Sequence, residues 1–331
     1  MKRYLISVII GLLAFAAGCQ AGPSVTFEKG DDKIDVLIDG KPFTSYLFGG
    51  KAYQRGEGLN EDGKVFLSKP VLFPVRSPSG VVVTRGYPLV EVEGERNDHP
   101  HHVGSFFTYD KINGNDFWNG KQASPQIKHV KVVEMKGGSG KGKLSTVMHW
   151  VGKDGKVVLE EKRSMVFIAG ENEYSIDFSI DLVARGEKVV FGDTKEGMFA
   201  VRTAGWLREK GGNGKYLSSN GDETAKNVWG KRAKWVRIEG DKDGKVIGIA
   251  ILHHPSSVNY PTYWHARNYG LFAANPLGQY VFEKKRNPET AKRFNLTLAA
   301  GENAHFGFRV IVYEGTRTKG QLESEFKQFA K

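Results

Sequence analysis

The sequence predicts an all-β fold, a large antiparallel β-sandwich with a short helix at its C-terminus. Apolar and polar residues alternate over several runs, which is the pattern of strands with one buried face. Asp-Gly and Asn-Gly pairs separate these runs, and such pairs supply the positive φ angles that tight hairpin turns need. The 41 glycines of the chain also fit many tight turns. We therefore expect two extended sheets packed face to face.

Each expected element follows from its own pattern. Alternating strands are predicted within residues 34–38, 174–182 and 306–312. The predicted turns lie at Asp39-Gly40, Asn113-Gly114, Asn119-Gly120, Asp154-Gly155, Asn220-Gly221 and Asp243-Gly244. The one predicted helix is C-terminal, because an i, i+4, i+7 apolar spacing is formed there by Leu322, Phe326 and Phe329.

One continuous domain is predicted over residues 24–331. No Pro/Ser-rich linker, repeat or abrupt change of composition divides this range. Large sandwiches often exceed the usual domain size, so length alone does not require a second domain. By size and composition the chain resembles the galactose-mutarotase supersandwich, a resemblance that implies a fold and not an activity.

The N-terminus indicates export. Two basic residues precede an apolar run, residues 5–17, that is too short to remain in a membrane as a spanning helix. Residues 1–18 are therefore predicted to be a signal peptide. They end in a sequence that resembles a bacterial lipobox, which would make Cys19 the lipidated N-terminus of a periplasmic or outer-membrane-anchored lipoprotein. The alternative is an ordinary signal peptide cut nearby.

The charge and the single cysteine narrow the function classes. The net charge of +11 is spread over the chain, and many lysines lie in predicted turns, which favours a solvated surface over a nucleic-acid groove. A basic surface could still attract anionic sugars or an anionic membrane surface. Because Cys19 is the only cysteine, the chain can form no internal disulfide.

The first candidate site is a histidine-rich loop. Histidine serves in proton transfer and in metal binding, and three histidines lie within four residues here. On an extended backbone His99 and His101 would point the same way, with His102 opposite, so the first two could chelate a metal. In the other interpretation His101 is a catalytic acid and the substrate is bound by Arg96, His102, Asp116 and Trp118.

A second histidine segment follows about 150 residues later. His253 and His254 end an apolar strand, and His254 is a candidate catalytic acid. Aromatic rings beside polar groups suit carbohydrate, because sugar C–H faces pack on aromatic faces while hydroxyls need hydrogen-bond partners. The predicted substrate-binding residues of this segment are Tyr263, Trp264, His265 and Arg267.

A third segment, residues 192–202, brings carboxylates. Asp193 and Glu196 are candidate bases, and Arg202 is a candidate clamp for an anion or hydroxyl. If Glu196 lies against a histidine of either segment, the pair could move protons at a sugar carbon or ring oxygen. The alternative is that both carboxylates lie in an exposed turn, paired with Lys195. The sequence contains no nucleophile elbow, P-loop or dinucleotide fingerprint.

Several motifs together resemble the PmoA-like family of exported bacterial proteins, which is often labelled methane oxygenase PmoA. They lie in order at residues 98–102 with 113–118, 192–197, 229–235 and 264–270. The resemblance implies an exported bacterial protein of uncharacterised activity, involved in glycan or sugar breakdown. It supplies no assigned catalytic residues.

Three hypotheses remain open at this stage. In the first, the protein is a sugar-active epimerase, lyase or hydrolase with Glu196 or Asp193 as base and His101 or His254 as acid. In the second, the protein is a metal-dependent enzyme or oxygenase: His99, His101 and a residue of the second histidine segment bind a divalent ion, and Glu196 completes the site. The third is a non-catalytic lipoprotein that binds a sugar or glycan-derived small molecule. Convergence of the histidine segments and Glu196 would favour an enzyme.

Overall fold

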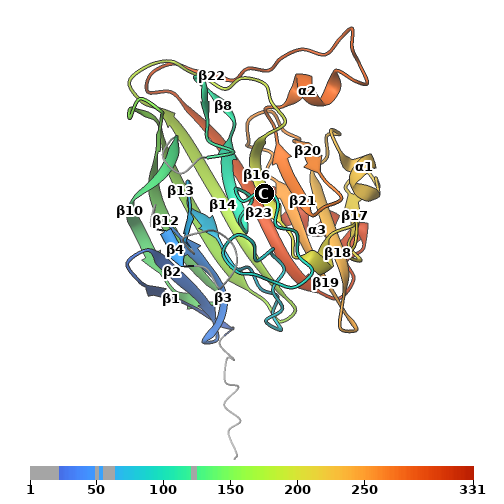
Figure 1. Ribbon diagram of the computed structural model, residues 1–331. Helices are drawn as coiled ribbons and strands as arrows, with labels where there is room; N and C mark the ends of the chain where they lie inside the picture. The colour runs from blue at the N-terminus through green and yellow to red at the C-terminus, as the bar shows by residue number, and fades with distance from the viewer. Residues whose placement is uncertain (1–21, 49–51, 55–63, 121–124) are drawn as a thin grey trace, which may run out of the picture.

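The computed structural model describes residues 22–48, 52–54, 64–120 and 125–331. Two large sheets dominate it, one of nine and one of eight strands, and the strand pairs within them are antiparallel. Figure 1 shows the long strands of the eight-stranded sheet lying side by side. The predicted all-β sandwich is confirmed. The predicted signal peptide and Cys19 lie outside the described residues.

The nine-stranded sheet carries the candidate site on its outer face. Its strands, in spatial order, are β11 (Gly138–Ser139), β1 (Ser24–Lys29), β2 (Lys33–Ile38), β3 (Lys41–Leu47), β6 (Val71–Leu72), β7 (Ser105–Tyr109), β16 (Gly197–Arg202), β21 (Leu271–Asn275) and β20 (Tyr263–Ala266).

The eight-stranded sheet forms the other layer. Its strands, in spatial order, are β10 (Gln126–Lys136), β12 (Lys141–Val151), β13 (Val157–Ala169), β14 (Glu173–Ala184), β23 (Asn303–Glu314), β19 (Lys245–His253), β18 (Trp235–Lys242) and β17 (Lys215–Ser218).

Short elements complete the described chain. Three strand pairs stand apart from the large sheets: β4 (Ala52–Gln54) with β5 (Lys64–Phe66), β8 (Lys111–Ile112) with β9 (Asn115–Asp116), and β15 (Val189–Val190) with β22 (Thr297–Leu298). The helical segments are η1 (Gly205–Leu207), α1 (Thr224–Val228), α2 (Gln279–Glu283) and α3 (Lys319–Phe329). No helix of the described ranges is both long and apolar enough to cross a membrane.

Alternation along each strand divides the apolar residues among three layers. In β7, Phe107 and Tyr109 enter the main core between the sheets, whereas Phe106 faces outward and joins a second cluster. In β19, Ile251 enters the main core, whereas Leu252 faces the opposite way and packs in the cluster that contains the buried side chains of α3. The sandwich therefore has a covered outer face on each side.

The terminal helix is present, and three of the six predicted turns have positive φ at both residues; at Asn119-Gly120, Asp154-Gly155 and Asn220-Gly221 only the glycine does. Asp39, Asn113 and Asp243 adopt positive φ angles of 49°, 46° and 55°, and the glycine after each does so as well. The helix α3 begins with a capping box in which the Thr318 side chain accepts from the Gln321 backbone N–H. Leu322 and Phe326 of this helix are buried, as their spacing predicts.

Candidate functional site

The candidate site lies on the outer face of β7, β16, β21 and β20. Their register places four outward residues in one row across the strands: Phe106, Ala200, Ala273 and His265. At about 4.8 Å between strands, the row from Phe106 to His265 spans roughly 14 Å. The histidine-rich loop lies near the Phe106 end, and Glu196 lies near the His265 end.

Arg85 holds the histidine-rich loop in place. This guanidinium is 2% exposed, and it donates hydrogen bonds to the backbone carbonyls of Asp98 and His102 at 2.7 and 3.1 Å. It also donates to the carbonyls of Arg96 and His99. One buried side chain therefore satisfies four loop carbonyls that would otherwise lack partners inside the protein.

Asp98 joins this loop to the sheet. Its Oδ1 accepts from Arg85 at 2.8 Å and from Arg202, on β16, at 2.7 Å. Its Oδ2 pairs with Arg96 at 2.9 Å. Burial raises the pKa of the Asp98 carboxyl, but the charges of Arg202 and Arg85 and the interaction with His99 outweigh burial and hold the pKa below its usual value. Asp98 is therefore a fixed anion between cations.

The three loop histidines do not alternate as an extended chain would place them. His99 has a φ of 48°, so the loop turns there, and the His99 ring stacks on His102 with centroids 5.0 Å apart. The His101 ring lies 4.2 Å from that of His102 and 5.7 Å from that of His99. The prediction that His102 points away from the other two was wrong, because the turn gathers the three rings.

Burial keeps the inner part of this cluster uncharged. It is the main cause that lowers the pKa of His101 to about 3, with the charge of Lys69 second. It also lowers the pKa of His102 well below the ordinary value, and the Nε2 atom of His102 is buried without a partner. Lys69 donates to the Trp118 carbonyl at 3.2 Å, and burial lowers its pKa to about 7 although the charge of Asp116 raises it.

The other end of the row pairs a carboxylate with a histidine. The Oε2 atom of Glu196 lies 3.9 Å from the Nδ1 atom of His265, and its Oε1 pairs with the Lys195 ammonium. His265 is 2% exposed, and its Nδ1 is buried without a hydrogen-bond partner. Burial, followed by the charges of Lys195 and Arg267, lowers the pKa of His265 to about 3.

Tyr269 connects the two ends. His99 stacks on its ring with centroids 5.3 Å apart, and the Arg202 guanidinium lies 4.5 Å from the ring centroid. Arg267 lies 5.4 Å from the centroid of the same ring, and its charge is one of the causes that lower the pKa of His265. The histidine-rich loop, Arg202, Arg267 and the Glu196–His265 pair therefore belong to one continuous cluster.

The second histidine segment is divided between the two sheets. His253 is completely buried between the sheets and stacks on Phe308 at 5.2 Å. His254 packs on Phe329 of α3 and shares a hydrogen bond with Ser256 at 2.7 Å. Both lie in or beside the eight-stranded sheet, whereas His265 lies on the other sheet. The structure therefore separates His254 from Glu196 and the loop, contrary to the catalytic role predicted for it.

Asp193, the other predicted base, stabilises local structure. Its carboxylate accepts from the backbone N–H groups of Tyr280 and Val281 in α2, at 2.8 and 3.0 Å. It is 4% exposed. An anion at a helix N-terminus satisfies N–H groups that the helix itself leaves unpaired, so the structure already accounts for this carboxylate.

The predicted substrate-binding aromatic residues are mostly buried. Trp264 is fully buried in the main core, and its indole donates to the Ala233 carbonyl. Trp118 is 1% exposed and packs against Phe106 under the loop. Tyr263 is 2% exposed, and its hydroxyl donates to Glu283. These rings support the site and do not form an exposed aromatic platform.

The remaining predicted residues have defined contacts. Asp116 accepts from the side chain and the backbone of Asn119, at 2.6 and 3.0 Å. Arg96 is half-exposed at the loop surface, paired with Asp98. In the described part of the chain, no three His, Cys, Asp or Glu side chains are arranged to hold a metal ion. The proposed His99–His101 metal pair therefore lacks a third such ligand among those residues.

The sequence pattern did not single out Arg85, Lys69 or Tyr269. Arg85 lies about a dozen residues before the loop that it holds, and an isolated arginine carries no signal of burial. Lys69 follows Ser68 before an apolar strand, and there it resembles one of the many surface lysines. Tyr269 lies in the 264–270 motif that resembles the PmoA-like family, and this motif was the only sequence feature that pointed to it.

Comparisons with known proteins place the chain in a family without assigning an activity. A family model described as "Family of unknown function (DUF6807)" matches residues 33–327. No curated protein matches the chain.

The chain is similar to several solved structures at low identity. The GH36 α-galactosidase AgaB from Geobacillus stearothermophilus matches with a TM-score of 0.40 at 11% identity, over 88% of this chain and 41% of that chain. A galactose mutarotase related enzyme from Lactobacillus acidophilus matches with a TM-score of 0.30 at 11% identity, over 89% of this chain and 98% of that chain. A putative aldose 1-epimerase from Klebsiella pneumoniae matches with a TM-score of 0.36 at 11% identity, over 92% of this chain and 85% of that chain. Likenesses this weak carry no argument about activity.

Proposed function

Because this chain belongs to the DUF6807 family, whose function is unknown, we propose its function from the site itself: an exported sugar-active enzyme that works by proton transfer. In this proposal Glu196 is the base that accepts a proton from the sugar, and His265 positions a sugar hydroxyl beside it by accepting a hydrogen bond. The enzyme class is an epimerase, lyase or hydrolase.

The observation that carries the proposal is the 3.9 Å approach of Glu196 Oε2 to His265 Nδ1. This Nδ1 is buried without a partner, and an unsatisfied buried polar atom costs on the order of 1–3 kcal/mol. A ligand hydroxyl that donated to Nδ1 would remove this cost. It would also lie beside a carboxylate that accepts protons, and general acid–base catalysis needs this arrangement.

The pair is built on rigid elements. His265 is on β20, and Glu196 immediately precedes β16, whose partner β21 lies between β16 and β20. Strands hold side chains more firmly than loops do, so His265 is fixed by β20, while Glu196 is placed by the start of β16 next to it. The low pKa of His265 keeps the imidazole neutral at pH 7, so that one ring nitrogen can accept a hydrogen bond.

The surrounding cations favour an acidic sugar. Arg267 is exposed beside the Tyr269 ring, and Lys195 lies beside Glu196, whereas the buried Arg202 is already paired with Asp98. A guanidinium binds a carboxylate through paired hydrogen bonds, which is the recognition that a sugar acid requires. We propose a uronic acid or another oxidised sugar, free or in a glycoside, as the substrate class.

The test compares Glu196→Gln with wild type on a panel of uronates and uronate-containing glycosides. Glutamine keeps the size of the side chain but cannot accept the proton, so turnover should fall about 100-fold or more while ligand affinity changes little. Glu171→Gln is the matched control, because Glu171 is an exposed carboxylate in the turn before β14, which belongs to the other sheet. Equal losses in both variants would overturn the role of Glu196. Binding without turnover in wild type would leave a sugar-binding protein.

Export is a separate proposal that rests on residues 1–19. If the lipobox is used, metabolic labelling with palmitate should mark the mature protein at Cys19, and Cys19→Ala should abolish the label. A mature protein without Cys19, cut at another site, would show that an ordinary signal peptide exports it.

A further inference from the structure

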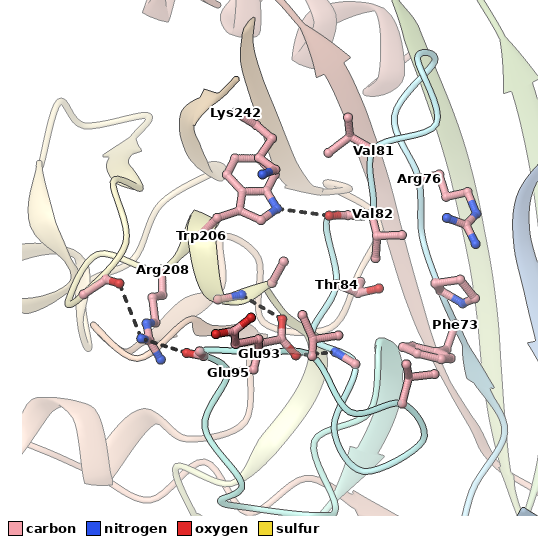
Figure 2. Close-up of a pocket in the computed structure, with 18 residues that line it drawn as sticks. Phe73, Arg76, Val81, Val82, Thr84, Glu93, Glu95, Trp206, Arg208 and Lys242 are labelled. Atoms are coloured by element: carbon pink, nitrogen blue, oxygen red, sulfur yellow. Dashed lines mark hydrogen bonds between the residues drawn. The ribbon is translucent and has the colours of Figure 1, made fainter. Parts of the chain in front are cut away.

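A second site lies away from the Glu196–His265 pair. A cavity of about 820 Å³ opens beside η1, between the segment around Val82 and the end of β18. Figure 2 shows Trp206 among the lining residues with its indole directed toward Val82, whose carbonyl accepts from the indole N–H at 3.1 Å. The volume falls in the range of about 300–1,000 Å³ that small-molecule sites occupy.

The walls of this cavity are mostly apolar. They are formed chiefly by Phe73, Pro74, Val81, Val82, Ala204 and Trp206. Val90 and Val92 also line the cavity, and they are 48% and 46% exposed. Among the described residues, the only other large apolar side chains so exposed are on β10. Apolar surface that gathers around a concavity is typical of a ligand site.

Two arginines of the cavity have no carboxylate partner in the described part of the chain. Arg76 forms no ion pair among the described residues, and Arg208 donates only to the Gly94 and Gly211 carbonyls, with its Nε buried and unpartnered. Figure 2 places these two guanidinium groups on opposite sides of the cavity. Lys242 pairs with Asp243 outside it.

The two carboxylates of the cavity do not neutralise these guanidinium groups. Glu95 accepts hydrogen bonds from the backbone N–H groups of Gly86 and Gly205, at 2.7 and 2.9 Å. Glu93 is exposed and forms no ion pair within the described ranges. An anionic group at either rim would therefore meet a guanidinium that has no carboxylate partner.

We propose that this cavity binds an amphipathic carboxylate, with its apolar body against Trp206 and the valines and its head group at Arg76 or Arg208. An acyl chain of about a dozen carbons or an aromatic acid has this chemistry. The apolar walls would remove the apolar body of the ligand from water, which favours binding. This site shares no residue with the proposed catalytic pair and does not depend on it.

The first experiment titrates the mature protein with dodecanoate, below its micelle concentration, and follows tryptophan fluorescence. We expect a saturable change with one site per chain. The Trp206→Phe variant should lose the signal change but still bind dodecanoate in calorimetry. Dodecyltrimethylammonium, which has the same chain and the opposite charge, should bind at least tenfold more weakly.

Two sets of variants locate the ligand. Arg76→Met/Arg208→Met should weaken dodecanoate binding about tenfold. The difference in affinity between dodecanoate and dodecyltrimethylammonium should become smaller. Val92→Asp places a charge at an exposed position, so the fold should survive while the affinity falls. The control is Lys153→Met/Arg185→Met, which removes the same charge from a polar cavity of about 610 Å³ elsewhere.

The proposal is overturned by several results. It fails if wild type shows no saturable binding, if both chain ligands bind equally, or if the control pair weakens binding as much as the cavity pair does. It also fails if glucuronate displaces dodecanoate while Val92→Asp binds like wild type, because the ligand would then be recognised as a sugar. Thermal unfolding of each variant separates lost binding from lost folding.

Discussion

Arg85 is the residue on which the arrangement of the histidine-rich loop depends most. It is buried and bonds to four loop carbonyls and to the Asp98 carboxylate. Asp98 would keep Arg202 and Arg96 as partners if Arg85 were removed. The four loop carbonyls would lose their donor, and each buried polar group left unsatisfied costs about 1–3 kcal/mol. We therefore expect Arg85→Met to lower the free energy of unfolding in urea by at least about 3 kcal/mol.

The control for Arg85 is its half-exposed neighbour in the same ion-pair group. Arg96 is 53% exposed and pairs with the same carboxylate. Exposed pairs contribute about 0–1 kcal/mol, so Arg96→Met should change unfolding little. If both variants lose the same stability, Arg85 has no special role in holding the loop.

At the residue scale, composition and spacing indicated the chemistry of the site but not its partners. The sequence predicted both Glu196 and His265 as site residues. They are 69 positions apart, and no local sequence pattern indicates that they lie close together. Their approach comes from the order β16–β21–β20, which is a long-range property of the sheet. His254 was chosen on the same grounds as His265, and the strand order places it on the other sheet.

At the element scale, local patterns sufficed for strands and turns. In β14, residues such as Ile176 and Ile180 alternate with polar neighbours, and their inward positions follow from the two-residue period. Asp243 and Gly244 predict the β18–β19 hairpin because both tolerate positive φ. The short helices α1 and α2 were not predicted, since five residues are too few to show a helical period.

The helix α3 gives a prediction at this scale. Its capping box and its buried face stabilise it by different means, because Thr318 satisfies a free N–H while Phe326 packs beside Trp235 and Leu252. Thr318→Ala should cost about 1 kcal/mol. Phe326→Ala should cost about 3–5 kcal/mol. Urea unfolding of both variants measures the two costs.

A matched change on the exposed face of α3 tests this assignment. Lys327 lies in the last turn of α3, next to Phe326, and is exposed. Its replacement by alanine should leave stability within about 0.5 kcal/mol of wild type. A larger loss of stability from Lys327→Ala than from Phe326→Ala would mean that α3 does not bury the face that carries Leu322 and Phe326.

For the whole molecule, the histidines whose pKa is lowered in the fold make stability depend on pH. Burial is the main cause that lowers the pKa of each of them in the folded protein. These residues are His101, His102, His129, His253, His254 and His265. In the unfolded chain an imidazole has a pKa near 6.5. Below about pH 6.5 the unfolded chain therefore binds more protons than the folded protein, and acid favours unfolding.

The expected effect is large because the sites act together. Each histidine that stays neutral in the fold and is protonated in the unfolded chain contributes about 1.4 kcal/mol per pH unit. His101, His253 and His265 have pKa values of about 3, so their contributions accumulate as the pH falls below about 6.5. A typical stability of about 5–15 kcal/mol would be consumed within a few pH units.

We therefore expect the free energy of unfolding in urea to fall steeply from pH 7 to pH 5, with a cooperative loss of the β-sheet signal in circular dichroism on further acidification. His253→Phe fills the same buried position between Tyr260 and Phe308 without a titrating group, so the fall should become shallower by about 1.4 kcal/mol per pH unit. His149→Gln, at a partly exposed position, is the control and should keep the wild-type slope. Equal unfolding free energies at pH 7 and pH 5 would contradict this expectation. They would show that these histidines take up protons in the folded protein, and therefore that water reaches them without unfolding.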